Sequence, residues 1–484
     1  MTSDYEVVVG IEVHVELATE SKVFCGCRTA FGAEPNTQTC PTCLGMPGAL
    51  PVLNKRALEF AIRAALALNC SVADYTKFDR KNYFYPDLPK GYQISQYDCP
   101  IGSNGYMDVD VNGESKRIRI KRVHLEEETA KLMHAGDDII SASHSLLDFN
   151  RSGIPLIEIV SEADMRSADE ARAYLTKLRS ILLAIGVSDC KMEEGSMRCE
   201  ANISVMPRGS EQYGTLVELK NIASFRAVHR AIQYEAARQI EIVSSGGEVA
   251  RETRHWDDAK GETAFMRGKE EAHDYRYFPE PDLGPIVIDR AWVEKIRGEL
   301  PELPDAKAER YMREWDLPKY DACQIADSAD LSDLFEKTCA IVGEGREVAK
   351  WILGEVMASL NATGIELSES KLTPELFAEL IDLMTTGKIS GKIAKSVFED
   401  VFSNGRRPSD IVKERGLLQI SDVGELVTIV EKVIDANPGP VADYHAGKER
   451  ALGFLVGQVM KETRGRANPQ ETNRILREEL DKRA

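Results

Sequence analysis

The sequence predicts an α+β fold, in which a strand-rich region precedes a helical one. Short runs that alternate apolar and polar residues recur at 7–17, 106–111, 116–120, 197–205 and 214–219. Only two helical stretches interrupt these runs, at 55–69 and 167–186. Strands and helices therefore do not alternate regularly, as they would in a fold built of βαβ units. After Trp292 the strand pattern stops and amphipathic helices follow, for example at 346–360 and 374–385.

Turn-forming residues mark the expected domain boundaries. The segment 278–285 contains three prolines and a glycine, and Asn404, Gly405 and Pro408 form a second break. The sequence therefore predicts a strand-rich domain at 1–293, a helical domain at 294–407 and a helical tail at 408–484.

Composition excludes wholesale disorder and a membrane protein. Of 484 residues, 43% are hydrophobic and 29% are charged, which is ordinary for a soluble globular protein. No run reaches the roughly 18 apolar residues of a membrane helix, and the first residues lack the features of a signal peptide. We expect a cytoplasmic protein with reduced or metal-bound cysteines.

The distribution of charge leaves room for a nucleic-acid partner. The net charge of −18 argues against one, but residues 440–484 hold nine Lys/Arg against seven Asp/Glu. A nucleic acid would have to bind such a local surface. The interspersed acidic residues leave a plain solvated helix face as the alternative.

Four cysteines have the spacing of a zinc site. Cys25 and Cys27 are separated by Gly26, and twelve residues later Cys40 and Cys43 form a C-x₂-C pair. Two close pairs joined by a loop supply the four ligands of a tetrahedral structural zinc ion. The alternative is four reduced thiols without metal.

The first predicted strand places acidic and imidazole side chains on one face. Apolar residues occupy the odd positions from 7 to 17, whereas Glu12, His14 and Glu16 occupy the even ones. Residues that share a face lie about 6.6–7 Å apart, so Glu12 and His14 can reach one cation. A solvent-exposed strand face is the alternative.

A basic strand runs directly into a run of carboxylates. Arg119, Lys121 and Arg122 precede the three glutamates at 126–128. Carboxylates bind Mg²⁺ and cationic side chains meet phosphate oxygens, so this run suits a Mg²⁺–polyphosphate site. A solvated charged face explains the same pattern.

Two further segments supply candidate nucleotide contacts. The proline-rich loop 81–93 combines aromatic, lysine and glycine residues, which can stack on bases and contact phosphates, although a surface loop anchored by aromatic residues explains it equally well. The strand 197–205 has a polar face that is either solvent-exposed or the floor of a cleft. The candidates from these segments are Lys81, Tyr83, Tyr85, Tyr92 and Arg198.

Several catalytic motifs are absent from the sequence. It contains no P-loop, no dinucleotide-binding glycine motif, no serine- and glycine-rich amidase loop with an upstream lysine, and no cysteine in a glutamine-hydrolysing context. An enzyme of this sequence that uses ammonia from glutamine must obtain it from another chain.

Taken together, the segments resemble one family along essentially the whole chain. The sequence resembles the B subunits of aspartyl/glutamyl-tRNA(Asn/Gln) amidotransferases. The phrases that carry the resemblance are GIEVHVEL at 10–17, CPTCLGMPGALP at 40–51, KNYFYPDLPKGY at 81–92, HLEE at 124–127, DFNRSGIPL at 148–156, MEEGSMRC at 192–199 and YRYFPEP at 275–281.

The resemblance implies an activity and its partners. Such a protein works in a heterotrimer with an amidase-type A subunit and a small C subunit. It uses ATP to phosphorylate the side-chain carboxylate of Glu-tRNA(Gln) or Asp-tRNA(Asn), and ammonia from the A subunit then displaces the phosphate. The family architecture is a β-rich cradle domain, a helical domain and a YqeY-like tail.

The resemblance also assigns residues. Glu12, His14 and Glu127 match the catalytic Mg²⁺ ligands of the family, Glu252 is a further ligand candidate, and Glu126 is the alternative to Glu127. The four cysteines match a structural Zn²⁺ set that not all members keep. Within the tail, Lys461, Arg464 and Arg466 are the candidate tRNA contacts.

A non-catalytic scaffold protein with an RNA-binding zinc ribbon is the competing hypothesis. It explains the cysteines and the tail, but it does not explain the face of the first strand that carries Glu12 and His14. Mg²⁺-dependent formation of ADP in the presence of charged tRNA and partner subunits distinguishes the two hypotheses.

Overall fold

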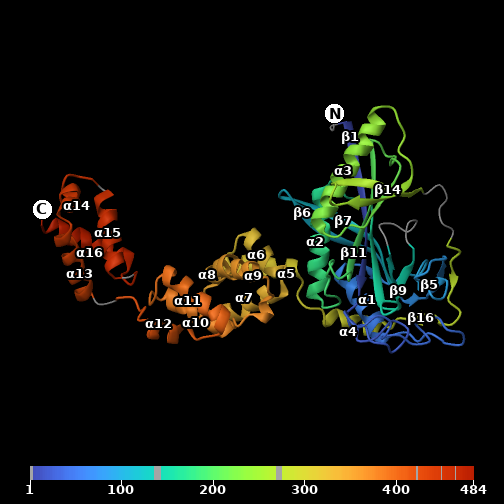
Figure 1. The fold of residues 1–484 in the computed structure, drawn as a ribbon, viewed down its shortest axis with the longest axis horizontal. Coiled ribbons are helices and arrows are strands. Elements are labelled where there is room, and N and C mark those ends of the chain that lie inside the picture. The colour runs from blue at the N-terminus through green and yellow to red at the C-terminus, as the bar shows by residue number, and fades with distance from the viewer. Residues whose placement is uncertain are drawn as a thin grey trace. The chain divides into compact units, whose positions relative to one another are not determined.

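The computed structural model has the predicted α+β fold. It describes residues 4–135, 143–268, 275–420, 423–448, 450–463 and 465–483. The chain forms two compact units, Met1–Leu303 and Pro304–Ala484. The first unit contains the sheets and the second is helical (Figure 1).

A nine-stranded sheet organises the first unit. Its order is β14-β13-β12-β11-β1-β10-β7-β6-β2, and adjacent strands are antiparallel except for the parallel pair β12 and β13. The strands, in chain order, are β1 (Tyr5–Glu16), β2 (Ser71–Val72), β6 (Gly102–Val111), β7 (Glu114–Glu127), β10 (Pro155–Ser161), β11 (Met197–Pro207), β12 (Val217–Lys220), β13 (Glu252–Asp257) and β14 (Glu262–Gly268). The long first strand lies in the middle of the sheet, with β10 and β11 as its neighbours.

Three helices pack on one face of this sheet: α1 (Lys55–Ala67), α2 (Ala168–Ala184) and α3 (Phe225–Ser244). The side chains of Asn54, Ser167 and Ser224 cap their first turns. Val9, Ile11, Val13 and Val15 of β1 are buried in the same core as the helices. Because side chains alternate along a strand, the even-numbered residues project from the opposite face.

The third of these helices is a difference from the sequence prediction, which placed only two helical stretches in this region. Helix α3 buries small and β-branched residues, Ala227, Val228, Ala231 and Ile232, on one side. Its remaining positions are largely charged or polar, so the apolar stripe is narrow and easily overlooked.

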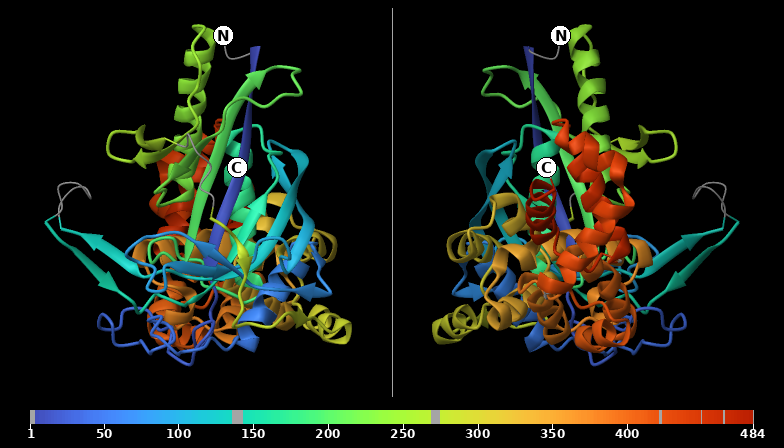
Figure 2. Two further views of the ribbon diagram at one scale, coloured as in Figure 1. Left: turned by 90° about the vertical axis from the view of Figure 1, so that its right-hand side faces the viewer. Right: turned by 90° about the vertical axis from the view of Figure 1, so that its left-hand side faces the viewer.

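Smaller elements complete the first unit. A three-stranded sheet has the order β15 (Phe278–Pro279), β4 (Asp79–Asn82) and β5 (Tyr92–Ser95), and β3 (Tyr75–Thr76) pairs with β16 (Ile286–Val287). Strands β8 (Lys131–His134) and β9 (Ser145–Asp148) form a hairpin that extends away from the main sheet (Figure 2).

The first unit continues past the boundary expected at 293. Helix α4 (Arg290–Gly298) buries Val293 and Ile296 in the hydrophobic core of the main sheet. Trp292, where the strand pattern was expected to stop, lies within this helix.

The second unit consists of short helices around two separate hydrophobic clusters. One cluster spans residues 308–412 and the other spans 426–480. The elements are α5 (Pro304–Trp315), α6 (Lys319–Ala326), α7 (Ala329–Val342), α8 (Gly345–Trp351), the π-helical turn η2 (Ile352–Val356), α9 (Met357–Thr363), the 3₁₀ turn η3 (Leu367–Glu369), α10 (Pro374–Thr385), α11 (Gly391–Asn404), α12 (Pro408–Glu414), α13 (Val423–Ala436), α14 (Pro438–His445), α15 (Arg450–Glu462) and α16 (Pro469–Asp481). The three-domain division stays a prediction. Within the described residues, no helix combines the length and apolar character that a membrane crossing requires.

Candidate functional site

A row of polar residues crosses the sheet on the face opposite the helices. Strand pairing aligns His124 of β7 with Glu158 of β10, Glu158 with His14 of β1, and His14 with Arg198 of β11. A neighbouring pair joins Glu12 to Glu200. Antiparallel register therefore gathers residues that are far apart in the sequence into one polar floor.

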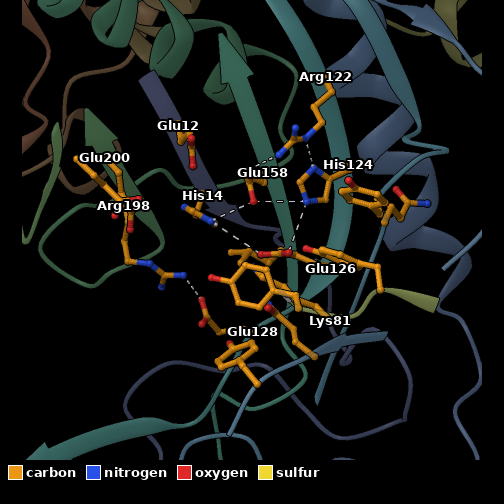
Figure 3. A pocket seen from close by; sticks show the side chains of 18 of the residues that line it. Glu12, His14, Lys81, Arg122, His124, Glu126, Glu128, Glu158, Arg198 and Glu200 are labelled. Atoms are coloured by element: carbon orange, nitrogen blue, oxygen red, sulfur yellow. Dashed lines mark hydrogen bonds and ion pairs between the residues drawn. The ribbon is translucent and has the colours of Figure 1, made fainter. Parts of the chain in front are cut away.

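This floor belongs to a cavity of about 510 Å³. Strands β4 and β5 and the segment 275–277 contribute to its other walls. Charged and tyrosine side chains dominate the lining, and ten of the residues are labelled in Figure 3: Glu12, His14, Lys81, Arg122, His124, Glu126, Glu128, Glu158, Arg198 and Glu200. Such a lining suits a charged ligand rather than an apolar one.

His14, Glu126 and Glu158 form a close cluster in the cavity. The Nε2 atom of His14 lies 3.4 Å from Glu158 Oε2 and 3.9 Å from Glu126 Oε1 (Figure 3). Burial disfavours a charged imidazole, but the hydrogen bond to Glu158 and the nearby carboxylates outweigh it and raise the pKa of His14 to about 9. One donor atom from each residue lies within 4.8 Å of the others, which is the spacing of ligands around a single ion.

The surroundings of Glu12 also fit a cation. Asn202 donates a 2.9 Å hydrogen bond to Glu12, yet burial and the charges of Glu158 and Glu200 raise the pKa of Glu12. A carboxylate whose charge is opposed in this way gains from a bound divalent cation. Glu12, His14, Glu126 and Glu158 are therefore the residues that fit a hard cation such as Mg²⁺.

Arg198 lines the same cavity but is engaged by an acidic partner. Its guanidinium donates to Glu128 and lies 3.8 Å from Glu16. Burial opposes ionisation of Glu128, but Arg198 and Arg151 outweigh it and lower the pKa of Glu128 to about 2. Burial and the neighbouring Glu128 raise the pKa of Glu16 to about 7.

Lys81 and Tyr83 line the cavity as the sequence suggested, together with tyrosines from the 275–277 segment. The ammonium of Lys81 lies 5.1 Å from the ring centre of Tyr275 and 5.9 Å from that of Tyr83. Although burial opposes its charge, Glu126 and other nearby groups raise the pKa of Lys81. Tyr277 stacks on Tyr97 with ring centres 4.4 Å apart.

The structure places Glu127 outside this cavity. Consecutive residues of a strand point to opposite faces, so Glu126 enters the main cavity and Glu127 lines a second cavity of about 160 Å³. There Glu127 lies 2.8 Å from Lys90 Nζ and accepts a 2.8 Å hydrogen bond from the backbone of Ile94. Of the two alternatives, Glu126 is the one beside His14.

Three other candidates also lie away from the cluster. Glu252 is paired with Arg254 at 2.8 Å and with Arg238 at 3.2 Å, and it does not line the cavity. Tyr92 faces the second cavity, with the guanidinium of Arg80 4.2 Å from its ring centre. Tyr85 is exposed and lines neither cavity.

The four cysteines come together as their spacing predicts. Their four Sγ atoms all lie within 4.8 Å of one another, and those of Cys40 and Cys43 are 3.9 Å apart. A hydrogen bond from Cys25 outweighs burial and, with contributions from Cys40 and Lys22, lowers the pKa of Cys43 to about 4. Four thiols in this arrangement, with the pKa values of Cys40 and Cys43 lowered, fit a closed zinc site.

The tail candidates are only partly described. Lys461 is exposed at the end of α15, Arg466 donates from its guanidinium to the carbonyl of Thr463 at 3.2 Å, and Arg464 lies outside the described residues. Other basic residues of the tail are paired with acids, for example Arg474 with Glu471 and Glu478.

Sequence reasoning missed Glu158 and gave His124 no role. A signal was present for Glu158, because it is the one charged residue in the apolar strand Pro155–Ser161. A buried charge in such a strand needs a partner or an ion. The partners of Glu158 come from β1 and β7, which only the register of the sheet reveals.

Fold and site together define a class: an α+β domain with a cation-fitting, carboxylate-lined cavity, followed by helical regions. Comparison with known families is specific. The GatB/GatE catalytic domain matches residues 7–294 and the GatB domain matches residues 333–480. The chain belongs to the family of aspartyl/glutamyl-tRNA(Asn/Gln) amidotransferase B subunits.

Individual relatives match along their whole length. Proteins named as the B subunit of aspartyl/glutamyl-tRNA(Asn/Gln) amidotransferase are 55% identical in Carboxydothermus hydrogenoformans and 57% identical in Caldanaerobacter subterraneus subsp. tengcongensis. These alignments cover 99% of this chain and 99% and 100% of the two relatives. A Geobacter protein of the same name, from strain M21, is 54% identical over 98% of this chain and 99% of its own length.

Proposed function

We propose that this chain activates the side-chain carboxylate of Glu-tRNA(Gln), Asp-tRNA(Asn) or both, using ATP, as the B subunit of a cytoplasmic, glutamine-hydrolysing amidotransferase. The observation that carries the proposal is the cluster of His14, Glu126 and Glu158 in a polar cavity of the matched catalytic domain. The names of the relatives support the tRNA substrates.

The chemistry requires activation before amidation. A carboxylate oxygen attacks the γ-phosphorus of ATP, so that an acyl phosphate forms and ADP leaves. The nitrogen of ammonia then attacks the acyl carbon, phosphate leaves with the bonding electron pair, and the nitrogen loses a proton to give the amide. Phosphoryl transfer of this kind depends on positioning and charge stabilisation more than on a protein nucleophile.

The residues of the cavity have different roles in this phosphoryl transfer. Glu12, His14, Glu126 and Glu158 would hold Mg²⁺, which when bound neutralises and orients polyphosphate oxygens. The Lys81 ammonium lines the same cavity and adds positive charge that phosphate oxygens can contact. Arg198 serves chiefly to neutralise Glu128, because the two are directly paired.

Other parts of the complex complete the reaction. The chain carries no glutaminase motif, so an amidase-type A subunit supplies the ammonia, and a small C subunit completes the heterotrimer. Zinc bound by Cys25, Cys27, Cys40 and Cys43 stabilises a loop and takes no part in chemistry, because four thiolates close the coordination shell. The tail at 408–484 binds the body of the tRNA.

ADP formation by the reconstituted complex tests the proposal. With charged Glu-tRNA(Gln) or Asp-tRNA(Asn) and both partner subunits, ADP should accumulate only when Mg²⁺ is present, and the Glu158→Gln complex should form little. A complex that amidates neither tRNA and forms no ADP would instead be a scaffold assembly.

A further inference from the structure

We propose that His124, oriented by Arg122, is a positioning residue that holds Glu126 and Glu158 in place as metal ligands. The inference rests on the proposed function, because it concerns the same cavity. It assigns a role to a residue that is itself outside the ligand cluster.

His124 touches both carboxylates with one ring nitrogen. Its Nε2 lies 3.5 Å from Glu126 Oε2 and 3.4 Å from Glu158 Oε2. The imidazole is only 3% exposed, so water does not compete for these contacts. Figure 3 shows the ring on the side of the carboxylates away from His14.

Arg122 determines which nitrogen of the ring carries the hydrogen. The Nε of Arg122 lies 3.3 Å from His124 Nδ1 and donates to it. A guanidinium has donors only, so Nδ1 is the acceptor and the ring hydrogen sits on Nε2. That tautomer aims its N–H at the two carboxylates.

The two histidines therefore serve different purposes. On Glu126 the two histidines contact different oxygens, Oε1 for His14 and Oε2 for His124, whereas on Glu158 both contact Oε2. A histidine that binds a cation must offer a free lone pair, so a bound cation would replace the hydrogen that His14 Nε2 shares with Glu158. His124, whose Nδ1 accepts from Arg122, instead directs Nε2 at the two carboxylates.

Strand geometry makes this arrangement rigid. His124 and Glu126 share one face of β7, and β-sheet register places Glu158 directly across from His124. Arg122 lies on the same face of β7 and also donates to Glu158 Oε1 at 3.2 Å. Hydrogen-bonding partners of this kind orient metal ligands, and their loss typically weakens metal binding about 10–100-fold.

The test measures Mn²⁺ binding to the full chain by electron paramagnetic resonance, with no tRNA or partner subunits. The glutamine of His124→Gln places an amide N–H where Nε2 was, whereas the shorter asparagine of His124→Asn reaches only the position of Nδ1. The Kd for Mn²⁺ should rise about 10–100-fold in His124→Asn and stay within about threefold of wild type in His124→Gln.

Controls separate positioning from general damage. His229→Asn removes a histidine that lies 3.1 Å from Asp169 outside the cavity, and it should bind Mn²⁺ like wild type. Zinc content and the midpoint of thermal unfolding should be similar in all three variants. A merely structural role for His124 would lower stability without separating asparagine from glutamine.

The outcomes distinguish the two levels of the proposal. Wild-type Mn²⁺ affinity in His124→Asn, or weak binding in a folded His124→Gln, overturns the role of His124. If Glu158→Gln binds Mn²⁺ as tightly as wild type, the cation site itself is misplaced and the proposed function fails with it. Weak binding in Glu158→Gln together with normal binding in His124→Asn overturns only the positioning role.

Discussion

Replacing Arg198 by methionine should expose the energetic cost of the buried carboxylate beside it. Arg198 pairs directly with Glu128, which is buried, and the more distant Arg151 lies 3.9 Å from the same carboxylate. Methionine keeps much of the apolar stem but removes the charge. An uncompensated buried carboxylate is strongly destabilising.

The lowered pKa of Glu128 gives the size of the stability loss expected for Arg198→Met. The pKa of Glu128 is about 2 rather than 4.5, which corresponds to about 3 kcal/mol of stabilisation at neutral pH. Because the pKa is lowered in the folded state, this stabilisation is complete above pH 4.5 and disappears as the pH falls toward 2. Arg151 still opposes the effect of burial in the variant, and we expect Arg198→Met to lose about 3 kcal/mol of stability at neutral pH.

Denaturant unfolding of the full chain at several pH values measures this effect. The variant should lose stability at pH 7, and the difference from wild type should shrink as the pH approaches 2. Adding Glu128→Gln to Arg198→Met should restore much of the loss, because no buried charge then lacks a partner.

Two results would refute the reasoning. Unchanged stability of Arg198→Met at pH 7 would show that the ion pair does not neutralise Glu128. Equal destabilisation with and without Glu128→Gln would show that Arg198 acts through packing alone.

The remaining predictions concern metal, zinc and tRNA. Glu158→Gln should reduce Mg²⁺-dependent ADP formation by the complex about 100-fold or more, and a wild-type rate would contradict the ligand assignment. Replacing both Cys40 and Cys43 by serine should remove about one zinc ion per chain. The site is excluded if metal analysis finds no zinc in wild-type protein that was purified without chelator. The buried ammonium of Lys22 donates to the carbonyl of Phe149 and favours the thiolate of Cys43, so Lys22→Met should release zinc to a chelator faster than Lys22→Arg, and equal rates would remove that role. Deleting 408–484 should raise the KM for charged tRNA about tenfold at moderate salt and reduce its salt dependence. An unchanged KM at several salt concentrations would show that the tail does not bind tRNA.

Much of this protein follows from local sequence patterns. Alternation along 7–17 predicts both the strand and the shared face of Glu12 and His14, since the period of a strand is two residues whatever surrounds it. The spacing of the four cysteines predicts their cluster, because both pairs are close in sequence and one loop joins them. The zinc candidate therefore needed little tertiary information.

Tertiary structure decided how the acidic residues are used. A run of three glutamates at 126–128 does not reveal which carboxylate joins His14, and the pleat of β7 sends Glu126 to one cavity and Glu127 to another. The family resemblance matched Glu127 and left Glu126 as the alternative. In the structure Glu126 is the one beside His14, because a shift of one position in a strand changes the face to which a side chain points.

Glu158 and His124 show where local reasoning stops. Their chemistry depends on contacts between β1, β7 and β10, three strands that are widely separated in the chain. Pairing register is set by long-range burial of the apolar face and not by the residues on the polar face. The sequence by itself thus determined which polar residues are available to the cavity, whereas the register of the central sheet decided which of them meet.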